Sequence, residues 1–95
     1  MRKENHIYVI FYENEIVGFL RESGRPKGYS LLEELVIHPQ FRGKGIASES
    51  MQLFKKLFPL CLAKTNAQNN IMNYILKKNS FKRISGERII NWELN

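Results

Sequence analysis

A glycine turn, Gly43-Lys44-Gly45, joins a segment with strand character to one with helical periodicity, and this junction restricts the folds open to the chain. Residues 31–37 are rich in Leu, Val and Ile, as strands are, and Pro39 ends the run. Residues 46–58 carry apolar side chains at helical spacing, and residues 59–64 form a second short apolar run. Two strands joined through a helix lie parallel in one sheet with a right-handed crossover. The fold must therefore contain at least one parallel strand pair.

The segments on either side of this unit predict antiparallel strands and one more helix. Residues 6–12 and 16–21 are rich in Ile, Val, Tyr and Phe around a short polar turn, which indicates a hairpin. A loop over residues 22–30 follows, and Asn69 is a suitable N-cap for a helix that ends near Asn79. The remaining predicted strands are residues 81–84 and 88–94. The predicted fold class is α/β (α+β), a mixed and mostly antiparallel sheet with a central parallel strand pair, in the order β-β-β-α-β-α-β-β.

The helical spacing also predicts which side chains face the core. In the first helix Ile46, Ser50, Leu53 and Leu57 recur at helical spacing, and they are flanked by Ala47, Met51, Phe54 and Phe58. In the second helix the expected core face consists of Ile71, Met72, Ile75 and Leu76.

Length and composition suggest one small domain over residues 1–95. No run approaches the roughly 18 apolar residues of a membrane helix. Residues 1–6 are polar and show no signal peptide. Cys61 is the only cysteine, so we expect no intrachain disulfide and a cytoplasmic protein. A formal net charge of +6 favours anionic partners. Nucleic acid is not an expected partner, because the sequence has no base-reading motif.

The glycine turn has the properties of an anion site. Gly43 and Gly45 allow positive φ and let backbone N–H groups approach a ligand, and the following helix adds the positive end of its dipole. Arg42 and Lys44 add positive charge. The dinucleotide fingerprint fails, because Ser48 stands where its third glycine is required, and the P-loop fails because its upstream glycine is missing.

Gln40, Gly43 and Gly45, after an apolar strand and an Ile-x-Pro step, resemble the central motif of the GNAT superfamily of acyl-CoA-dependent N-acyltransferases. The resemblance covers about residues 7–94. It implies an N-acetyltransferase that moves an acetyl group from acetyl-CoA to an amine, such as a protein lysine, an N-terminus or a polyamine. The implied cofactor-binding residues are Leu35, Val36, Ile37, Gln40, Phe41, Arg42, Gly43, Lys44, Gly45, Ile46, Ala47 and Asn69.

Within that resemblance, the amides of residues 42–47 take the CoA pyrophosphate, and the pantetheine arm runs between the two parallel strands. Asn69 matches an asparagine that contacts the pantetheine, and it can equally be a plain N-cap.

The sequence departs from the family pattern in two places. The chain begins directly at the hairpin, so we expect the acceptor wall to come from the loop over residues 22–30, a second subunit or the acceptor itself. The tyrosine that serves many members as general acid is replaced by Leu76. Tyr74 lies about 200° around the helix from Leu76, and we expect it to pack in the core.

Amine attack also needs a base, because an ammonium must lose its proton first. The candidate catalytic residues are Glu33 and Glu34, and strand alternation predicts one on each face of the sheet. The alternative is that both are surface charges. Cys61 is expected in the core and His38 in a turn. The two histidines and one cysteine are scattered, so no metal site is predicted.

The alternative function is a catalytically weak or inactive acyl-CoA-binding module that regulates or binds a partner. The absent tyrosine supports that alternative. A homodimer that pairs through the last two strands is also open, and the acceptor and acyl length are not specified by the sequence.

Overall fold

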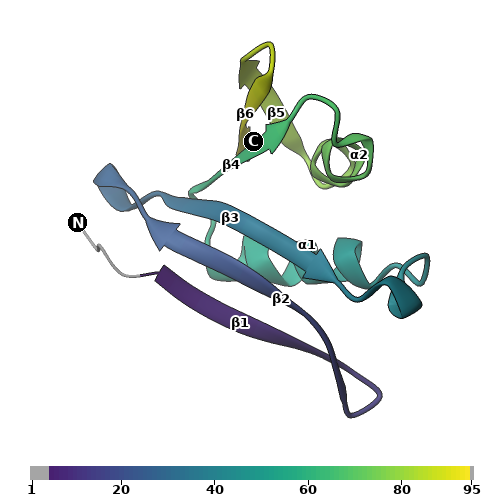
Figure 1. The fold of residues 1–95 in the computed structure, drawn as a ribbon. Coiled ribbons are helices and arrows are strands. Elements are labelled where there is room, and N and C mark those ends of the chain that lie inside the picture. The colour runs from purple at the N-terminus through teal and green to yellow at the C-terminus, as the bar shows by residue number, and fades with distance from the viewer. Residues whose placement is uncertain (1–4, 95) are drawn as a thin grey trace.

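The computed structural model describes residues 5–94 and contains one six-stranded sheet with two helices (Figure 1). The spatial strand order is β1-β2-β3-β4-β6-β5. The strands are β1 Asn5–Tyr12, β2 Glu15–Gly24, β3 Ser30–Ile37, β4 Cys61–Asn66, β5 Phe81–Ser85 and β6 Ile89–Leu94. The helices are α1 Ile46–Leu57 and α2 Asn70–Lys78, with short 3-10 turns at Pro26–Gly28 and Pro39–Phe41.

The predicted fold class is confirmed. β3 and β4 are parallel, and the other neighbouring strands are antiparallel. The final strand β6 lies between β4 and β5, so both of its edges are used and only β5 is left to extend the sheet at that end. Residues 1–4, which include most of the polar start of the chain, lie outside the described residues. Among the described residues no helix is long and apolar enough to cross a membrane.

The second strand is longer than the sequence predicts. Residues 22–24, expected in a loop, continue β2, because Ser23 and Gly24 pair with Leu31 and Ser30 of β3. The connection shortens to residues 25–29, closed by a 2.8 Å hydrogen bond from the Arg25 amide to the Tyr29 carbonyl.

One core holds the two helices on the sheet. Met51 and Phe54 of α1 pack with Leu76 of α2 and with strand residues including Leu32 and Trp92. Only part of the apolar surface expected on α1 is buried: Met51 and Phe54 are in the core, whereas Leu53 and Leu57 are 58% and 65% exposed. The apolar stripe of α1 is wide, and the sheet covers only the half that carries Met51 and Phe54, while Leu53 and Leu57 line an open hollow beside β1.

The predicted core face of α2 also needs correction. Leu76 is fully buried, but Ile71 is 71% exposed and Tyr74 is 65% exposed. Tyr74 therefore does not pack in the core; it lies on the far side of the helix from Leu76, as the 200° rotation between them requires. The two helices are joined by Asn79, whose side-chain Nδ2 donates to Ser48 Oγ at 3.2 Å and to the Ile75 carbonyl at 2.8 Å.

Candidate functional site

β3 and β4 are neighbours over only part of their length. Their parallel pairing covers Ser30–Cys61, Leu31–Leu62 and Leu32–Ala63 and then stops, although β3 continues to Ile37. Figure 1 shows β4 diverging from β3 beyond this point. Residues 33–37 of β3 therefore have no strand partner on the β4 side, and their backbone groups on that side are open to a ligand, except the Ile37 carbonyl, which accepts from Arg42 Nε.

A cleft of about 530 Å³ occupies the wide end of this opening. Its walls come from the end of β3, the glycine turn, the start of α1 and one face of α2. Ten of the twelve predicted cofactor-binding residues line it: Leu35, Val36, Ile37, Phe41, Arg42, Gly43, Gly45, Ile46, Ala47 and Asn69. The other two, Gln40 and Lys44, do not line this cleft.

The glycine turn presents unpaired backbone donors to the cleft. Gly43 and Gly45 have φ of 80° and 78°, a region that side chains rarely adopt, and a Cβ at either position would meet nothing within 4 Å. The first amide of the α1 region that finds an acceptor is that of Glu49, which donates to the Gly45 carbonyl at 3.0 Å. No described residue accepts from the amides of residues 43–48. This row of amides at the positive end of α1 is suited to an anion such as a diphosphate.

Positive side chains flank the turn. Arg42 Nε donates to the Ile37 carbonyl at 3.1 Å, which holds the arginine against the end of β3. Lys44 is exposed. Gln40 is also exposed. Its backbone amide donates to Nδ1 of His38 at 3.2 Å, so the glutamine belongs to the 3-10 turn that leads into the site.

Asn69 lies at the start of α2, across the cleft from the turn. Its Oδ1 accepts from the Met72 amide at 3.1 Å, so the N-cap interpretation is confirmed. The cap uses only the oxygen, and the side-chain NH₂ makes no hydrogen bond to any described residue. Contact with a ligand is therefore still available to Asn69, and that role stays a prediction.

Sequence reasoning missed most of the wall that α2 provides. Besides Asn69, this helix lines the cleft with Ile71, Met72, Tyr74, Ile75 and Lys78. Lys78 Nζ lies 5.9 Å from the centre of the Tyr74 ring. The sequence contains a signal for this wall, because Ile71, Tyr74 and Lys78 share one side of the helix. Apolar residues at helical spacing are, however, also typical of a core, and the prediction placed them there.

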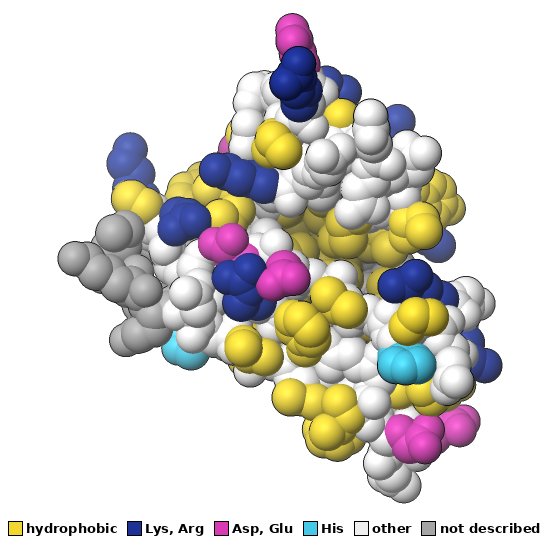
Figure 2. Space-filling view, viewed as in Figure 1, with side chains coloured by type: hydrophobic (Ala, Val, Ile, Leu, Met, Phe, Trp, Pro, Cys, Tyr) yellow, Lys and Arg dark blue, Asp and Glu magenta, His cyan; other side chains and the backbone are white. Residues whose placement is uncertain are grey.

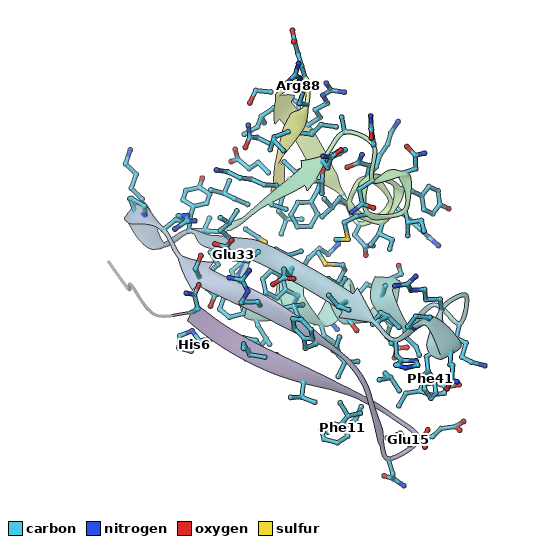
Figure 3. All side chains as sticks on the ribbon, viewed as in Figure 1. His6, Phe11, Glu15, Glu33, Phe41 and Arg88 are labelled. Atoms are coloured by element: carbon cyan, nitrogen blue, oxygen red, sulfur yellow. The ribbon has the colours of Figure 1, made fainter. Side chains whose placement is uncertain are left out.

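Glu33 and Glu34 lie at the narrow end of the opening and are on the same face of the sheet. The register shifts there, because Arg21 pairs with Glu34 and Glu22 with Leu32, which leaves Glu33 as an extra residue in a β-bulge. The prediction of one glutamate on each face is therefore wrong. A bulge interrupts the two-residue period, so Glu33, labelled in Figure 3, reaches Ser23 and Arg25 while Glu34 reaches Arg21.

Each glutamate binds its neighbours through one oxygen. Oε1 of Glu33 accepts from Ser23 Oγ at 2.7 Å and from Arg25 at 3.1 Å. Oε1 of Glu34 accepts from Nε and a terminal nitrogen of Arg21, at 2.9 and 2.8 Å. The other oxygen of each carboxylate has no partner among the described residues. Both glutamates line a hollow of about 290 Å³ with Lys64 and Asn69.

Cys61 and His38 do not contribute to this site. Burial of the thiol, with a smaller effect from the Glu22 carboxylate, raises the pKa of Cys61 from 9.0 to about 12, so the thiol stays protonated and unreactive. His38 lies in the turn before Pro39 and contacts the Phe41 ring. Within residues 5–94, no group of three or more His, Cys, Asp or Glu side chains is arranged to hold a metal ion.

Comparison with known proteins identifies this arrangement. Residues 1–70 match the family model described as Acetyltransferase (GNAT) family. The chain belongs to the GNAT family. No curated protein matches it in sequence.

Solved structures of GNAT proteins share the fold. A GNAT family acetyltransferase from Elizabethkingia anophelis, solved with acetyl-CoA bound, superposes with a TM-score of 0.83 at 15% identity, covering 96% of this chain and 76% of that one. An IAA acetyltransferase from Bacillus cereus gives 0.85 at 10% identity, with 95% and 77% covered. PaiA N-acetyltransferase from Thermoplasma acidophilum, in complex with coenzyme A, gives 0.77 at 20% identity, with 97% and 61% covered. The chain thus spans less than two thirds of the PaiA protein's length.

Within the GNAT fold, the departure seen in the sequence has a structural meaning. Leu76 is fully buried between the helices and the sheet, so no hydroxyl group stands at the position where many members carry their acid. Thr65 offers the nearest buried hydroxyl on β4, but it donates to Asn73 Oδ1 and accepts from Trp92 Nε1.

Proposed function

We propose that this chain is an N-acetyltransferase that moves an acetyl group from acetyl-CoA to an amine by direct attack on the thioester. The observation that carries the proposal is the early end of the β3–β4 ladder, which leaves a gap with free amides at one end and two glutamates at the other. Cys61 is the only cysteine and stays a thiol, which suits a reducing compartment. We therefore propose that the protein is located in the cytoplasm.

The donor's pyrophosphate binds at the glycine turn in this proposal. The amides of residues 43–47, which have no acceptor among the described residues, are available to the anion, and hydrogen bonds to a charged group contribute about 1.5–3 kcal/mol each. Lys44 and Arg42 add attraction at longer range. On the opposite wall, the exposed ring of Tyr74 and the ammonium of Lys78 form an amphipathic surface for the nucleotide end of the cofactor.

The pantetheine arm then runs along the open edge of β3 as an added strand. Its amides bond to backbone groups of residues 33–36, which β4 leaves without a strand partner. A strand rises about 3.3 Å per residue, so the path from Ile37 back to Leu32 covers about 16 Å. The arm ends where Leu32 and Ala63 close the gap, which brings the thioester beside the Glu33 bulge.

The free carboxylate oxygen of Glu33 or Glu34 takes the proton from the incoming ammonium, directly or through a water. The neutral nitrogen then attacks the thioester carbonyl, its second proton passes to water, and the C–S bond breaks to release CoA thiolate. Ser23 and the two arginines hold the carboxylates in place from behind. Because both glutamates share one face, either can serve the same acceptor.

The leaving thiolate receives its proton from solvent in this scheme, since Leu76 has none to give. A thiolate is a fair leaving group, so transfer proceeds without a dedicated acid. The rate is lower than it would be with one. The burial of Leu76 also favours the second candidate, an acyl-CoA-binding module without turnover.

The decisive experiment measures CoA release and acetylated product by mass spectrometry with a panel of amine acceptors. Glu33→Gln, Glu34→Gln and the double variant test the base, and Glu15→Gln, an exposed glutamate at the hairpin turn, is the matched control. Loss of about a hundredfold or more in kcat/KM in the double variant, with acetyl-CoA affinity retained, supports the enzyme. Tight acetyl-CoA binding without turnover on any acceptor would contradict the enzyme proposal and support the acyl-CoA-binding module.

A further inference from the structure

We propose that the acceptor is an amine that also carries an anionic group such as a carboxylate, and that Lys64 binds that group. The inference rests on the proposed function, because it names the substrate class of the same site. It follows from the charges that surround the narrow end of the gap.

The two glutamates of the gap are already matched by cations. Glu34 pairs with Arg21 and Glu33 with Arg25. Glu93 of β6 accepts a 3.3 Å hydrogen bond from the Tyr29 hydroxyl. Figure 2 shows acidic and basic side chains side by side in the middle of this face.

Lys64 is a further cation beside these ion pairs. Cys61, Ala63 and Thr65 of β4 are buried, so the alternation of the strand sends Lys64 to the exposed face. It makes no hydrogen bond or ion pair with any described residue. It lines the same hollow as Glu33 and Glu34, from the opposite side of the gap.

Lys64 lies close to the proposed site of acetyl transfer. Lys64 follows Ala63, the residue that closes the gap with Leu32, so its stem begins next to the place where the proposed thioester ends. An acceptor nitrogen that reaches the thioester beside Glu33 can place one of its substituents over Lys64. An anionic substituent there gains an ion pair, whereas a second ammonium faces a local excess of positive charge.

The same face offers an apolar platform next to the ion pairs. Val9, Phe19 and Val36 lie opposite one another across three strands, and the next row of the sheet contains Arg21 and Glu34. Val9 and Val36 are 49% and 38% exposed. Hydrophobic side chains are visible beside the charged group in Figure 2. An acceptor with an apolar body can lie across this row while its amine reaches the glutamates.

Three acceptors test the inference. Phenylalanine and phenethylamine differ only in the carboxylate, and spermidine is a polycation. We expect kcat/KM to be about two- to fivefold higher for phenylalanine than for phenethylamine, the range of a partly exposed ion pair, with spermidine lowest. Lys64→Gln should abolish the difference by lowering the value for phenylalanine alone. Lys56→Gln, an exposed lysine on α1, should change neither.

A binding measurement separates this inference from the proposed function. Calorimetric titration of CoA-loaded protein with N-acetylphenylalanine and N-acetylphenethylamine needs no turnover. Tighter binding of the carboxylate product that depends on Lys64 supports the acceptor site even if no amine is acetylated, in which case only the catalytic proposal fails. Equal binding of the two products, or a preference for spermidine in wild type, would overturn the inference while leaving acetyl transfer intact.

Discussion

Leu32 of β3 and Ala63 of β4 form the last pair of the parallel ladder, and both are almost completely buried. Their packing in the core fixes the closed end of the gap, because a buried close-packed contact cannot shift without loss of stability. The open end is fixed separately, by the α1–α2 contact through Asn79. The opening between the strands is therefore a permanent feature of the fold.

The turn can be tested by a substitution that keeps its backbone conformation. Gly45→Asn should fold, because asparagine tolerates the left-handed region, but its side chain would enter the anion site and weaken acetyl-CoA binding about tenfold or more. Calorimetric titration measures the affinity. Gly28→Asn, at φ 80° in a loop away from the cleft, is the matched control and should bind normally. Gly45→Val is less informative, because valine strains the backbone at φ 78° whatever the ligand does.

The two roles of Asn69 can be separated with two substitutions. Asn69→Ser keeps a cap oxygen and should change the free energy of unfolding by only a few tenths of a kcal/mol, whereas Asn69→Ala should cost about 1 kcal/mol. If the side-chain NH₂ binds the pantetheine, both variants should weaken acetyl-CoA binding about three- to tenfold, as loss of one hydrogen bond does. Wild-type affinity in a stable Asn69→Ser protein would restrict the residue to capping.

Asn79 should contribute strongly to stability. It is 3% exposed, bridges Ser48 and the Ile75 carbonyl, and accepts from Lys55 Nζ through its own carbonyl at 2.9 Å. Asn79→Ala removes the side-chain hydrogen bonds to Ser48 and to the Ile75 carbonyl and should lower the free energy of unfolding by about 1–3 kcal/mol in urea denaturation. Asn70→Ala, exposed at the start of α2, should change it by less than about 0.5 kcal/mol. An equal effect of the two variants would contradict the bridging role.

Cys61 gives a pH-dependent prediction. Its pKa is raised to about 12 in the folded protein, so between about pH 9 and 12 the unfolded chain loses the thiol proton and the folded chain keeps it. Stability conferred by this group is complete below pH 9 and is lost as the pH rises, by at most about 1.4 kcal/mol per pH unit. The unfolding free energy of Cys61→Ala should therefore fall less steeply in this window than that of wild type. Parallel profiles for the two proteins would show that the thiol does not titrate differently on unfolding.

Much of the fold follows from local patterns in the sequence. The apolar runs on both sides of Gly43 and Gly45 require a parallel pair, and the turn residues delimit the other strands closely. The end of β2 was missed because residues 22–24 contain Glu, Ser and Gly and resemble a loop. They form a strand only because residues 30–32 of β3 pair with them, and such tertiary pairing overrides local propensity.

The parts of the site formed by backbone groups could be predicted from the sequence. The parts formed by side chains were harder to predict. The turn amides follow from Gly43 and Gly45, but the positions of Glu33 and Glu34 depend on a bulge that no local signal announces. The exposure of Ile71 and Tyr74 depends on the separation of β4 from β3, which periodicity does not reveal. Apolar residues that line a cleft and apolar residues that fill a core have the same helical spacing.

Backbone hydrogen exchange with saturating acetyl-CoA tests the central claim most directly. The account predicts slower exchange at the amides of residues 43–48 and at the open edge of β3, residues 33–37, with little change in β1. Unchanged exchange at both segments, or protection confined to the hollow between β1 and α1, would contradict the assignment of the gap between β3 and β4 as the acetyl-CoA site.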